Sequence, residues 1–370
     1  QEVRHAHGTY YGQNTISGNM IFVNRNQLLN GNCIVLGVSG GGKSFFVKED
    51  ATSIILANPN ADVLIIDPER EYNLLVNALG GEVVNISSNS ENHINAMDMN
   101  KNYEDDKNPI ATKSEFIMSL CEQLIGGTVG PKDKSIIDRC CRNVYANYIK
   151  SGYKITPPTL KDFREELLNQ PETEAQELAL ALELFTDGSL NTFAQPTNVD
   201  INNRLICYDI LDLGEQLLPV GMLVVLDNIL NRITSNRTKG RTTYIFIDEI
   251  YLLFAQKYTA DFLYRVWKRV RKYGAFATGI TQNVGDMLQS NTARTMLANS
   301  EFTVMLNQNG SDRLDLSKLL NISDNQTEFF TNVQAGHGLM KIGGHFVPYA
   351  NEFPKNTELY KLMTTKPGEA

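Results

Sequence analysis

The sequence predicts an α/β fold in which a mostly parallel sheet is interrupted by an all-helical insertion. Strand and helix patterns alternate from residue 33 to residue 86, as in βαβ units. From residue 103 to residue 195 only helical periodicity is found, and strand patterns then return at 205–210, 243–247, 275–281 and 302–306. We therefore expect a core in two parts, 1–102 and 196–350, with the insertion at 103–195 and a helical tail at 351–370.

The elements follow one another in a definite order. The strand at 33–36 is followed by a helix to about residue 57, a strand at 62–66, a helix at 69–79 and a strand at 82–86. In the insertion, Asn108-Pro109 and Pro158-Thr159 are helix-start signals, and another helix is expected at 174–185. Gly343-Gly344 separates the strand patterns 338–342 and 345–349, which predicts a hairpin before a short helix at 356–363.

A glycine-rich segment directly follows the strand at 33–36. It reads Gly37-Val38-Ser39-Gly40-Gly41-Gly42-Lys43-Ser44 and matches the pattern GxxxxGK[ST]. Chance matches arise in roughly one in a hundred chains of this length, before the strand is required. We expect the loop backbone, from Gly37 through Ser39, Gly40, Gly41 and Gly42, to bind phosphate, with Lys43 toward the γ-phosphate and Ser44 on Mg²⁺. The sequence therefore predicts a nucleoside triphosphate site.

A second motif indicates hydrolysis of ATP. The apolar strand ending at Ile247 is followed by Asp248 and Glu249, a Walker B arrangement. Asp248 is expected to hold the Mg²⁺ shell, and Glu249 to orient or deprotonate the attacking water. No NKxD motif for guanine recognition is found in the chain, which disfavours a GTPase switch. The alternative is a strand capped by acidic residues that begin a helix.

Five segments in one order carry a family resemblance. They are the phosphate loop, 67–72 (DPEREY), 94–98 (INAMD), 247–249 (IDE) and 271–274 (RKYG) through Thr281-Gln282. Over nearly the whole chain they resemble the conjugative-transfer ATPases of type IV secretion systems, the TrbE and TraC class of the FtsK and HerA superfamily. Ala96 departs from the pattern, where a proline is expected.

The resemblance implies a RecA-like P-loop NTPase core with an inserted all-helical domain. It implies a hexamer that works at the cytoplasmic face of the bacterial membrane with other secretion subunits, including a coupling ATPase. The chain opens on Gln1 without an initiator methionine or a signal peptide. We therefore expect a fragment whose membrane tether lies outside it.

Gln282 and Arg271 are further candidates for the site. Gln282 ends a strand expected beside the Walker B strand, where its amide could sense the γ-phosphate or hold the lytic water; a turn-forming role is the alternative. The resemblance to ring motors places Arg271 as an arginine finger on a neighbouring subunit's nucleotide. A helix-terminal charge is the alternative, and Arg294 and Arg313 are rival fingers. Asp67 with Pro68 fits a helix N-cap better than direct catalysis.

Composition limits the partners. A net charge of −8 and a pI near 5.3 argue against a dedicated nucleic-acid surface, and residues 104–195 hold ten basic against fifteen acidic side chains. Basic groups gather locally at two places: Arg265, Lys268, Arg269 and Lys272 on one helical face, and Arg232, Arg237, Lys239 and Arg241 around a loop. We expect at most weak, nonspecific DNA binding.

The cysteines predict that the protein lies in a reducing compartment, and the hydropathy predicts that the chain does not span a membrane. The five cysteines, at 33, 121, 140, 141 and 207, lack metal spacing and are expected to be buried free thiols. The longest apolar stretch, 217–226, contains Pro219 and Gly221 and is shorter than the ~20 residues that a bilayer requires.

Three functions remain open. The first is a motor ATPase that energises a type IV secretion or conjugation apparatus. The second is a DNA translocase or helicase of the FtsK and HerA type, and the third is a nucleotide-gated scaffold with little turnover. The acidic charge and the DPEREY and INAMD segments favour the first.

Overall fold

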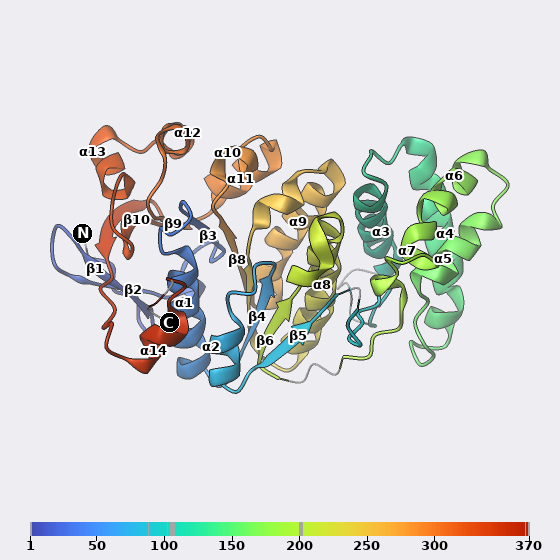
Figure 1. Ribbon diagram of the computed structural model, residues 1–370, viewed down its shortest axis with the longest axis horizontal. Helices are drawn as coiled ribbons and strands as arrows, with labels where there is room; N and C mark the ends of the chain where they lie inside the picture. Colours follow the sequence, from blue (N-terminus) through green and yellow to red (C-terminus); the bar gives the residue numbers. More distant parts are fainter. Residues whose placement is uncertain are drawn as a thin grey trace.

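The structure is a computed structural model that describes residues 2–87, 89–101, 103, 108–199, 203–366 and 368. Within these residues the strands form one eleven-stranded sheet. Figure 1 shows antiparallel strands at one end of the molecule, parallel strands in the middle and a group of helices at the other end. The single, mostly parallel sheet confirms the predicted fold class.

Seven of the described strands run parallel, and they contain all the core strands that the sequence predicts. They are β3 (Cys33–Leu36), β4 (Ala61–Asp67), β5 (Glu82–Asn85), β6 (Leu205–Asp209), β7 (Thr242–Ile247), β8 (Ala275–Thr281) and β9 (Phe302–Met305). The predicted hairpin is formed by β10 (His337–Ile342) and β11 (His345–Ala350). β1 (Thr9–Asn14) and β2 (Met20–Val23) extend the antiparallel end, and the sequence analysis does not identify them.

The strand order brings the two motifs to one edge of the sheet. It runs β2-β1-β11-β10-β9-β3-β8-β7-β4-β6-β5. β3, which leads into the phosphate loop, lies between β9 and β8, and β7, which ends in the Walker B carboxylates, lies between β8 and β4. Because these strands are parallel, their carboxyl ends share one edge, where ligands of open α/β sheets bind.

Helices cover both faces of the sheet. Along β3, Ile34 and Leu36 belong to one hydrophobic cluster, whereas Cys33 and Val35 belong to the other, as the alternation of a strand requires. α1 (Lys43–Ala57) and α2 (Asn73–Ala78) pack on the second cluster. The first cluster lies under α8 (Gly214–Thr238), α9 (Lys257–Arg269), α10 (Val284–Met287), α11 (Asn291–Asn299) and α12 (Gly310–Leu320). The sheet is thus buried on both sides.

Among the described residues between β5 and β6, helices are the regular secondary structure, and five of them are α-helices. They are α3 (Pro109–Ile125), α4 (Pro131–Lys150), α5 (Leu160–Leu168), α6 (Thr173–Ala181) and α7 (Glu183–Thr186). Pro109 begins α3 and Thr159 caps α5, as predicted. The helix expected at 174–185 is divided at Leu182, whose carbonyl accepts from Phe185, an i+3 bond that tightens the chain. These helices share the first cluster with the sheet.

The division into domains stays a prediction. The boundary expected at 102/103 touches residues 102 and 104–107, which lie outside the described residues. The tail expected at 351–370 also contains three residues outside the described ones, 367, 369 and 370. In the tail, α14 (Glu358–Met363) confirms the short helix, and its Tyr360 ring lies 5.4 Å from the Phe45 ring of α1.

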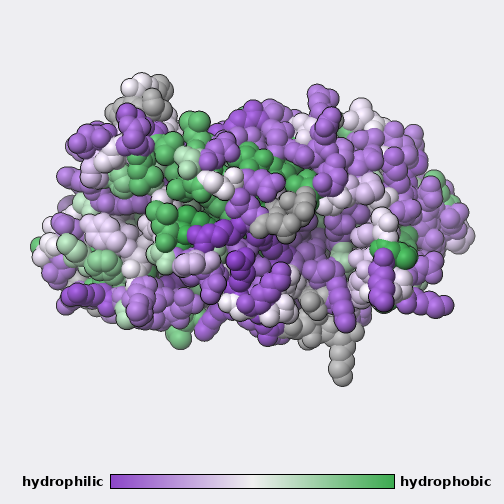
Figure 2. Space-filling model, turned by 90° about the horizontal axis from the view of Figure 1, so that it is seen from below, coloured by the Kyte–Doolittle hydropathy of each residue, from purple (hydrophilic) through white to green (hydrophobic). Residues whose placement is uncertain are grey.

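On the face in Figure 2, the half with α3 to α7 is mainly hydrophilic and apolar side chains gather over the sheet half.

Helix α8 is longer than the apolar stretch that the sequence analysis singled out. It runs through Pro219 and Gly221 without a break, so the apolar helix is longer than expected, and the segment Leu211–Thr238 could cross a membrane by length and composition only. In the structure 61% of its most apolar window is buried, as in the core helix of a soluble protein. The five cysteines are free and buried, as predicted.

Candidate nucleotide-binding site

The phosphate loop forms a tight turn between β3 and α1. Gly40 and Gly42 have φ angles of 71° and 93°, in the left-handed region that glycine adopts without strain. The N–H of Val38 donates to the carbonyl of Asn307 after β9 (2.9 Å), and the N–H of Gly41 donates to the carbonyl of Val38 (3.0 Å). The neighbouring strand ends therefore fix the loop at the N-terminus of α1, where the helix dipole favours an anion.

Lys43 and Ser44 are the first two residues of α1. Lys43 is buried, and its Nζ donates to the carbonyl of Val38 inside the loop (3.1 Å). Burial lowers the pKa of Lys43, and the negative charges of Glu249 and Asp248 oppose this effect. The ammonium of Lys43 therefore interacts electrostatically with the Walker B carboxylates. The sequence predicts that these residues surround the same phosphate.

Asp248 lies directly after β7 and is almost fully buried. Its Oδ1 accepts from the backbone N–H of Glu249 (3.0 Å), and its Oδ2 accepts from the hydroxyl of Tyr72 (3.2 Å). Burial raises the pKa of Asp248 well above its ordinary value, and the charges of Glu249 and Glu71 act in the same direction. A divalent cation at this carboxylate would offset that cost, so the residue fits the predicted Mg²⁺ site.

Glu249 is held in an unusual backbone conformation. Its φ of 47° is left-handed for a residue that carries a Cβ, a feature that concentrates at functional sites. Burial raises the pKa of Glu249 to about 7, and the charge of Glu69 adds to the rise, whereas Lys43 and a hydrogen bond from Gln282 oppose it. Its Oε2 is buried without a hydrogen-bond partner among the described residues.

Gln282 follows β8 directly, and β8 pairs in parallel with β7 as the sequence predicts. Hydrogen bonding by its side chain lowers the pKa of the Glu249 carboxyl, against the larger effect of burial. The phosphate loop, Asp248, Glu249 and Gln282 therefore meet at the carboxyl edge of three neighbouring strands.

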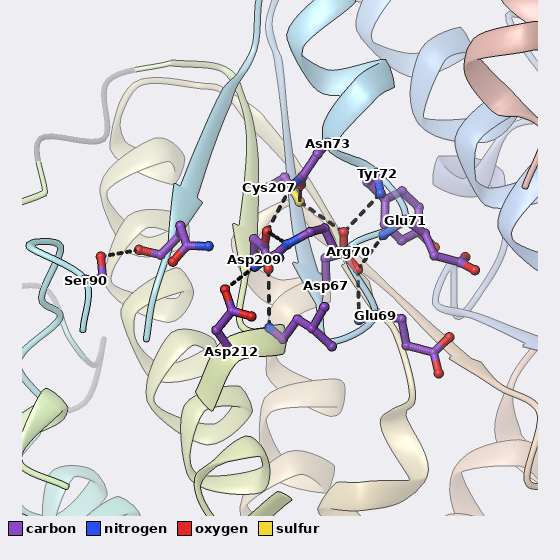
Figure 3. Close-up of polar contacts among 12 residues, drawn as sticks. Asp67, Glu69, Arg70, Glu71, Tyr72, Asn73, Ser90, Cys207, Asp209 and Asp212 are labelled. Atoms are coloured by element: carbon purple, nitrogen blue, oxygen red, sulfur yellow. Dashed lines mark hydrogen bonds and ion pairs between the residues drawn. The ribbon is translucent and has the colours of Figure 1, made fainter. Parts of the chain in front are cut away.

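The loop from 68 to 72 is part of this site, and the sequence analysis missed its role. Figure 3 shows Arg70 extending toward Asp209 and Asp212, while Glu69 and Glu71 extend to the other side of the loop. The charge of Glu71 affects the pKa of Lys43 and of Asp248, and its Oε2 is buried without a partner among the described residues. In the part of the chain that the structure describes, two buried carboxylate oxygens at this edge, on Glu71 and Glu249, thus lack donors.

Asp67 does not cap a helix, which corrects the expected helix at 69–79. The observed α2 begins at Asn73, because the Asp67 carboxylate accepts the backbone N–H groups of Glu69 (3.2 Å), Glu71 (3.2 Å) and Tyr72 (3.0 Å). These bonds fold the segment into a loop instead of a helical turn. The signal was present in the Asp-Pro pair, which also favours turns.

The candidate arginine finger lies away from its own chain's site. Arg271 is exposed in the short 3₁₀ turn that precedes β8 and so lies at the amino edge of the sheet. The seven residues of β8 put roughly 20 Å between it and Gln282. The rivals differ: Arg294 donates its Nε to the carbonyl of Leu288 (2.5 Å), and Arg313 lies in the first turns of α12, after the carboxyl end of β9. Within one chain, Arg271 is not brought to the site.

Comparisons with known proteins agree with this geometry. The family model of the TraG P-loop domain matches residues 19–341. The structure of VirB4 of Thermoanaerobacter pseudethanolicus is similar, with a TM-score of 0.81 and 23% identity over 96% of this chain and 98% of that one. The plasmid coupling protein TrwB in complex with ADP and Mg²⁺ has a TM-score of 0.57 and 14% identity, over 97% of this chain and 99% of that one.

A curated relative covers much less. It is an uncharacterized protein of Aquifex aeolicus (strain VF5), 35% identical over 52 residues, which are 14% of this chain and 19% of that protein. The match therefore spans about a fifth of that relative's length. The family match, in contrast, covers most of the chain and confirms the resemblance to the motor ATPases of type IV secretion and conjugation: the chain belongs to the TraG P-loop domain family.

Proposed function

We propose that this chain is the ATP-hydrolysing motor domain that energises a type IV secretion or conjugation apparatus. The observation that carries the proposal is the position of Glu249. It is a buried carboxylate with one oxygen that lacks a partner among the described residues, beside Asp248 and within reach of the charge of Lys43. A carboxylate so placed suits a general base that orients and deprotonates water.

The residues present fit ATP with Mg²⁺. The glycine loop and Lys43 would hold the phosphates, and the Ser44 hydroxyl and the Asp248 carboxylate are hard oxygen ligands of the kind that Mg²⁺ prefers. The bound ion would neutralise charge that develops on the phosphates. Gln282 would hold Glu249, or the water itself, in the orientation for attack.

Assembly is part of the proposal. Arg271 can serve catalysis only if its exposed guanidinium reaches a neighbouring subunit's nucleotide, which a ring such as a homo-hexamer provides. The match to the TraG P-loop domain family supports the role that the resemblance implies: work with other secretion subunits, including a coupling ATPase, at the cytoplasmic face of the bacterial membrane.

The DNA translocase is the second candidate, and its support is weaker. Arg232 and Arg241 both bind the buried carboxylate of Asp62, at 2.6 and 3.1 Å. Arg265 pairs with Glu115 (3.1 Å). Three of the basic groups that could have formed a DNA surface are thus paired with carboxylates of the same chain.

A pair of variants tests the proposal. Glu249→Gln should bind a fluorescent ATP analogue with Mg²⁺ as the natural chain does, yet lose about 10²- to 10⁴-fold of the steady-state ATPase rate, because only the base is removed. Lys43→Ala is the contrasting control and should lose nucleotide binding itself. An unchanged rate in Glu249→Gln would remove Glu249 from the mechanism.

A further inference from the structure

Tyr72 is the loop residue that touches the candidate Mg²⁺ ligand. Its side chain is fully buried, and its hydroxyl donates to Oδ2 of Asp248 (3.2 Å). The other oxygen of Asp248 accepts from the N–H of Glu249 (3.0 Å). Each oxygen of this carboxylate therefore has one fixed donor, which sets the plane of the group and leaves further lone pairs for a ligand.

The tyrosine itself is fixed from two sides. Its backbone N–H donates to Oδ2 of Asp67 at the end of β4 (3.0 Å). Its ring lies 5.8 Å from Nζ of Lys48, a buried residue of α1 whose ammonium donates to the carbonyl of Met363 (3.2 Å). The hydroxyl is thus held between the phosphate-loop helix and the strand next to β7.

The same loop is anchored on its outer side by Arg70. Its Nε donates to Oδ2 of Asp209 at the end of β6 (2.6 Å), and its Nη2 pairs with Asp212. Arg70 has a φ of 58°, a left-handed conformation that is strained for a residue with a Cβ. This strained backbone is part of the loop conformation that places the Tyr72 side chain in the core.

We propose that Tyr72 is a positioning residue for metal binding, whose hydroxyl orients Asp248 to receive the Mg²⁺ that accompanies the nucleotide. The inference rests on the proposed function. Partners that hold a metal ligand in its binding orientation commonly change metal affinity about 10- to 100-fold when they are removed. The ring has a separate role in packing, so the hydroxyl is the atom to test.

Tyr72→Phe removes the hydroxyl and keeps the ring. The measurement is binding of a fluorescent ATP analogue to the purified chain, first in EDTA and then as Mg²⁺ is added. We expect binding in EDTA within about twofold of the natural chain, because the phosphate loop is untouched. The Mg²⁺ concentration that gives half the metal-dependent gain should rise about tenfold.

Two controls separate positioning from packing. Tyr349→Phe removes another buried hydroxyl, on β11, that has no partner among the described residues, and should change neither measurement. In an Asp248→Asn background, Tyr72→Phe should cause no further loss, because the residue acts through Asp248.

The outcomes distinguish this inference from the proposed function. If the natural chain binds nucleotide with Mg²⁺ and Tyr72→Phe has the same Mg²⁺ dependence, the positioning role is overturned and the proposed function stands. Equal losses in EDTA and in Mg²⁺ also overturn it, since they indicate a packing defect. A natural chain that binds no nucleotide overturns both.

Discussion

Across the paired strands β8 and β7, hydrogen bonding by the side chain of Gln282 opposes the rise in the pKa of Glu249 that burial causes. The bond connects the residue expected to sense the γ-phosphate with the residue expected to activate water. One oxygen of Glu249 remains buried and unpartnered among the described residues. We therefore expect Gln282 to orient this carboxylate while one of its oxygens stays available to a water molecule.

Removing this amide should slow turnover without preventing binding. We expect Gln282→Ala to lower kcat about 10- to 100-fold, because the carboxylate loses the group that orients it. Steady-state ATPase rates and analogue binding in Mg²⁺ measure the two effects. Gln289→Ala is a matched control, since Gln289 is exposed and bonds only weakly, to Asp286 (3.4 Å). An unchanged ATPase rate in Gln282→Ala would show that Gln282 only forms the turn after β8.

The predictable part of the site is local in the sequence. The phosphate loop follows from glycine spacing after a strand, and Asp248 and Glu249 from acids at the end of an apolar strand. Gln282 required one topological step, the pairing of β8 with β7, which the structure confirms. For these residues, the position at a strand end and the chemistry of the side chain predict the same site.

The missed part depends on contacts between distant segments. Helical periodicity at 69–79 gave no sign that the carboxylate of Asp67 would take three backbone N–H groups, so the contact of Tyr72 with Asp248 stayed hidden. Strand β1 pairs with β11, where Gln13 lies opposite Ala350, a partner more than 300 residues away. Short, polar strands of this kind are recognisable only once their partners are placed.

Removal of one partner of a buried ion pair should lower the stability of the chain strongly. Nζ of Lys113 in α3 lies 2.6 Å from Oδ2 of Asp227 in α8, and both are almost fully buried. Lys113→Met should lower the free energy of unfolding by about 3–5 kcal/mol, since the Asp227 charge remains uncompensated. Urea unfolding of the purified chain measures it.

The double variant is the control for that result. Lys113→Met with Asp227→Asn should recover much of the loss, because no buried charge remains and the amide oxygen still accepts from the Tyr103 hydroxyl. A double variant no more stable than Lys113→Met would show that packing of the lysine stem, not charge, carries the effect.

DNA should bind weakly and lose affinity steeply with salt. The net charge is −8, and Arg232, Arg241 and Arg265 are engaged in internal ion pairs. We expect no sequence preference, and binding that falls at least tenfold between about 50 and 200 mM salt, as for contacts made only to phosphate. Fluorescence anisotropy with labelled duplexes of unrelated sequence tests this. Tight binding at physiological salt would favour the translocase.

The last prediction concerns Arg271, which lies at the amino edge of β8, too far from its own chain's site to act there. Arg271→Ala rings should lose about 10³- to 10⁵-fold of the ATPase rate, because the guanidinium stabilises charge during transfer. Lys43→Ala rings should also be inactive, for lack of bound nucleotide. Mixing the two variants before assembly should restore part of the rate, since an intact Arg271 then faces an intact phosphate loop at some junctions. Arg294→Ala and Arg313→Ala, mixed in the same way, identify a rival finger. Full activity of assembled Arg271→Ala rings would refute the assignment.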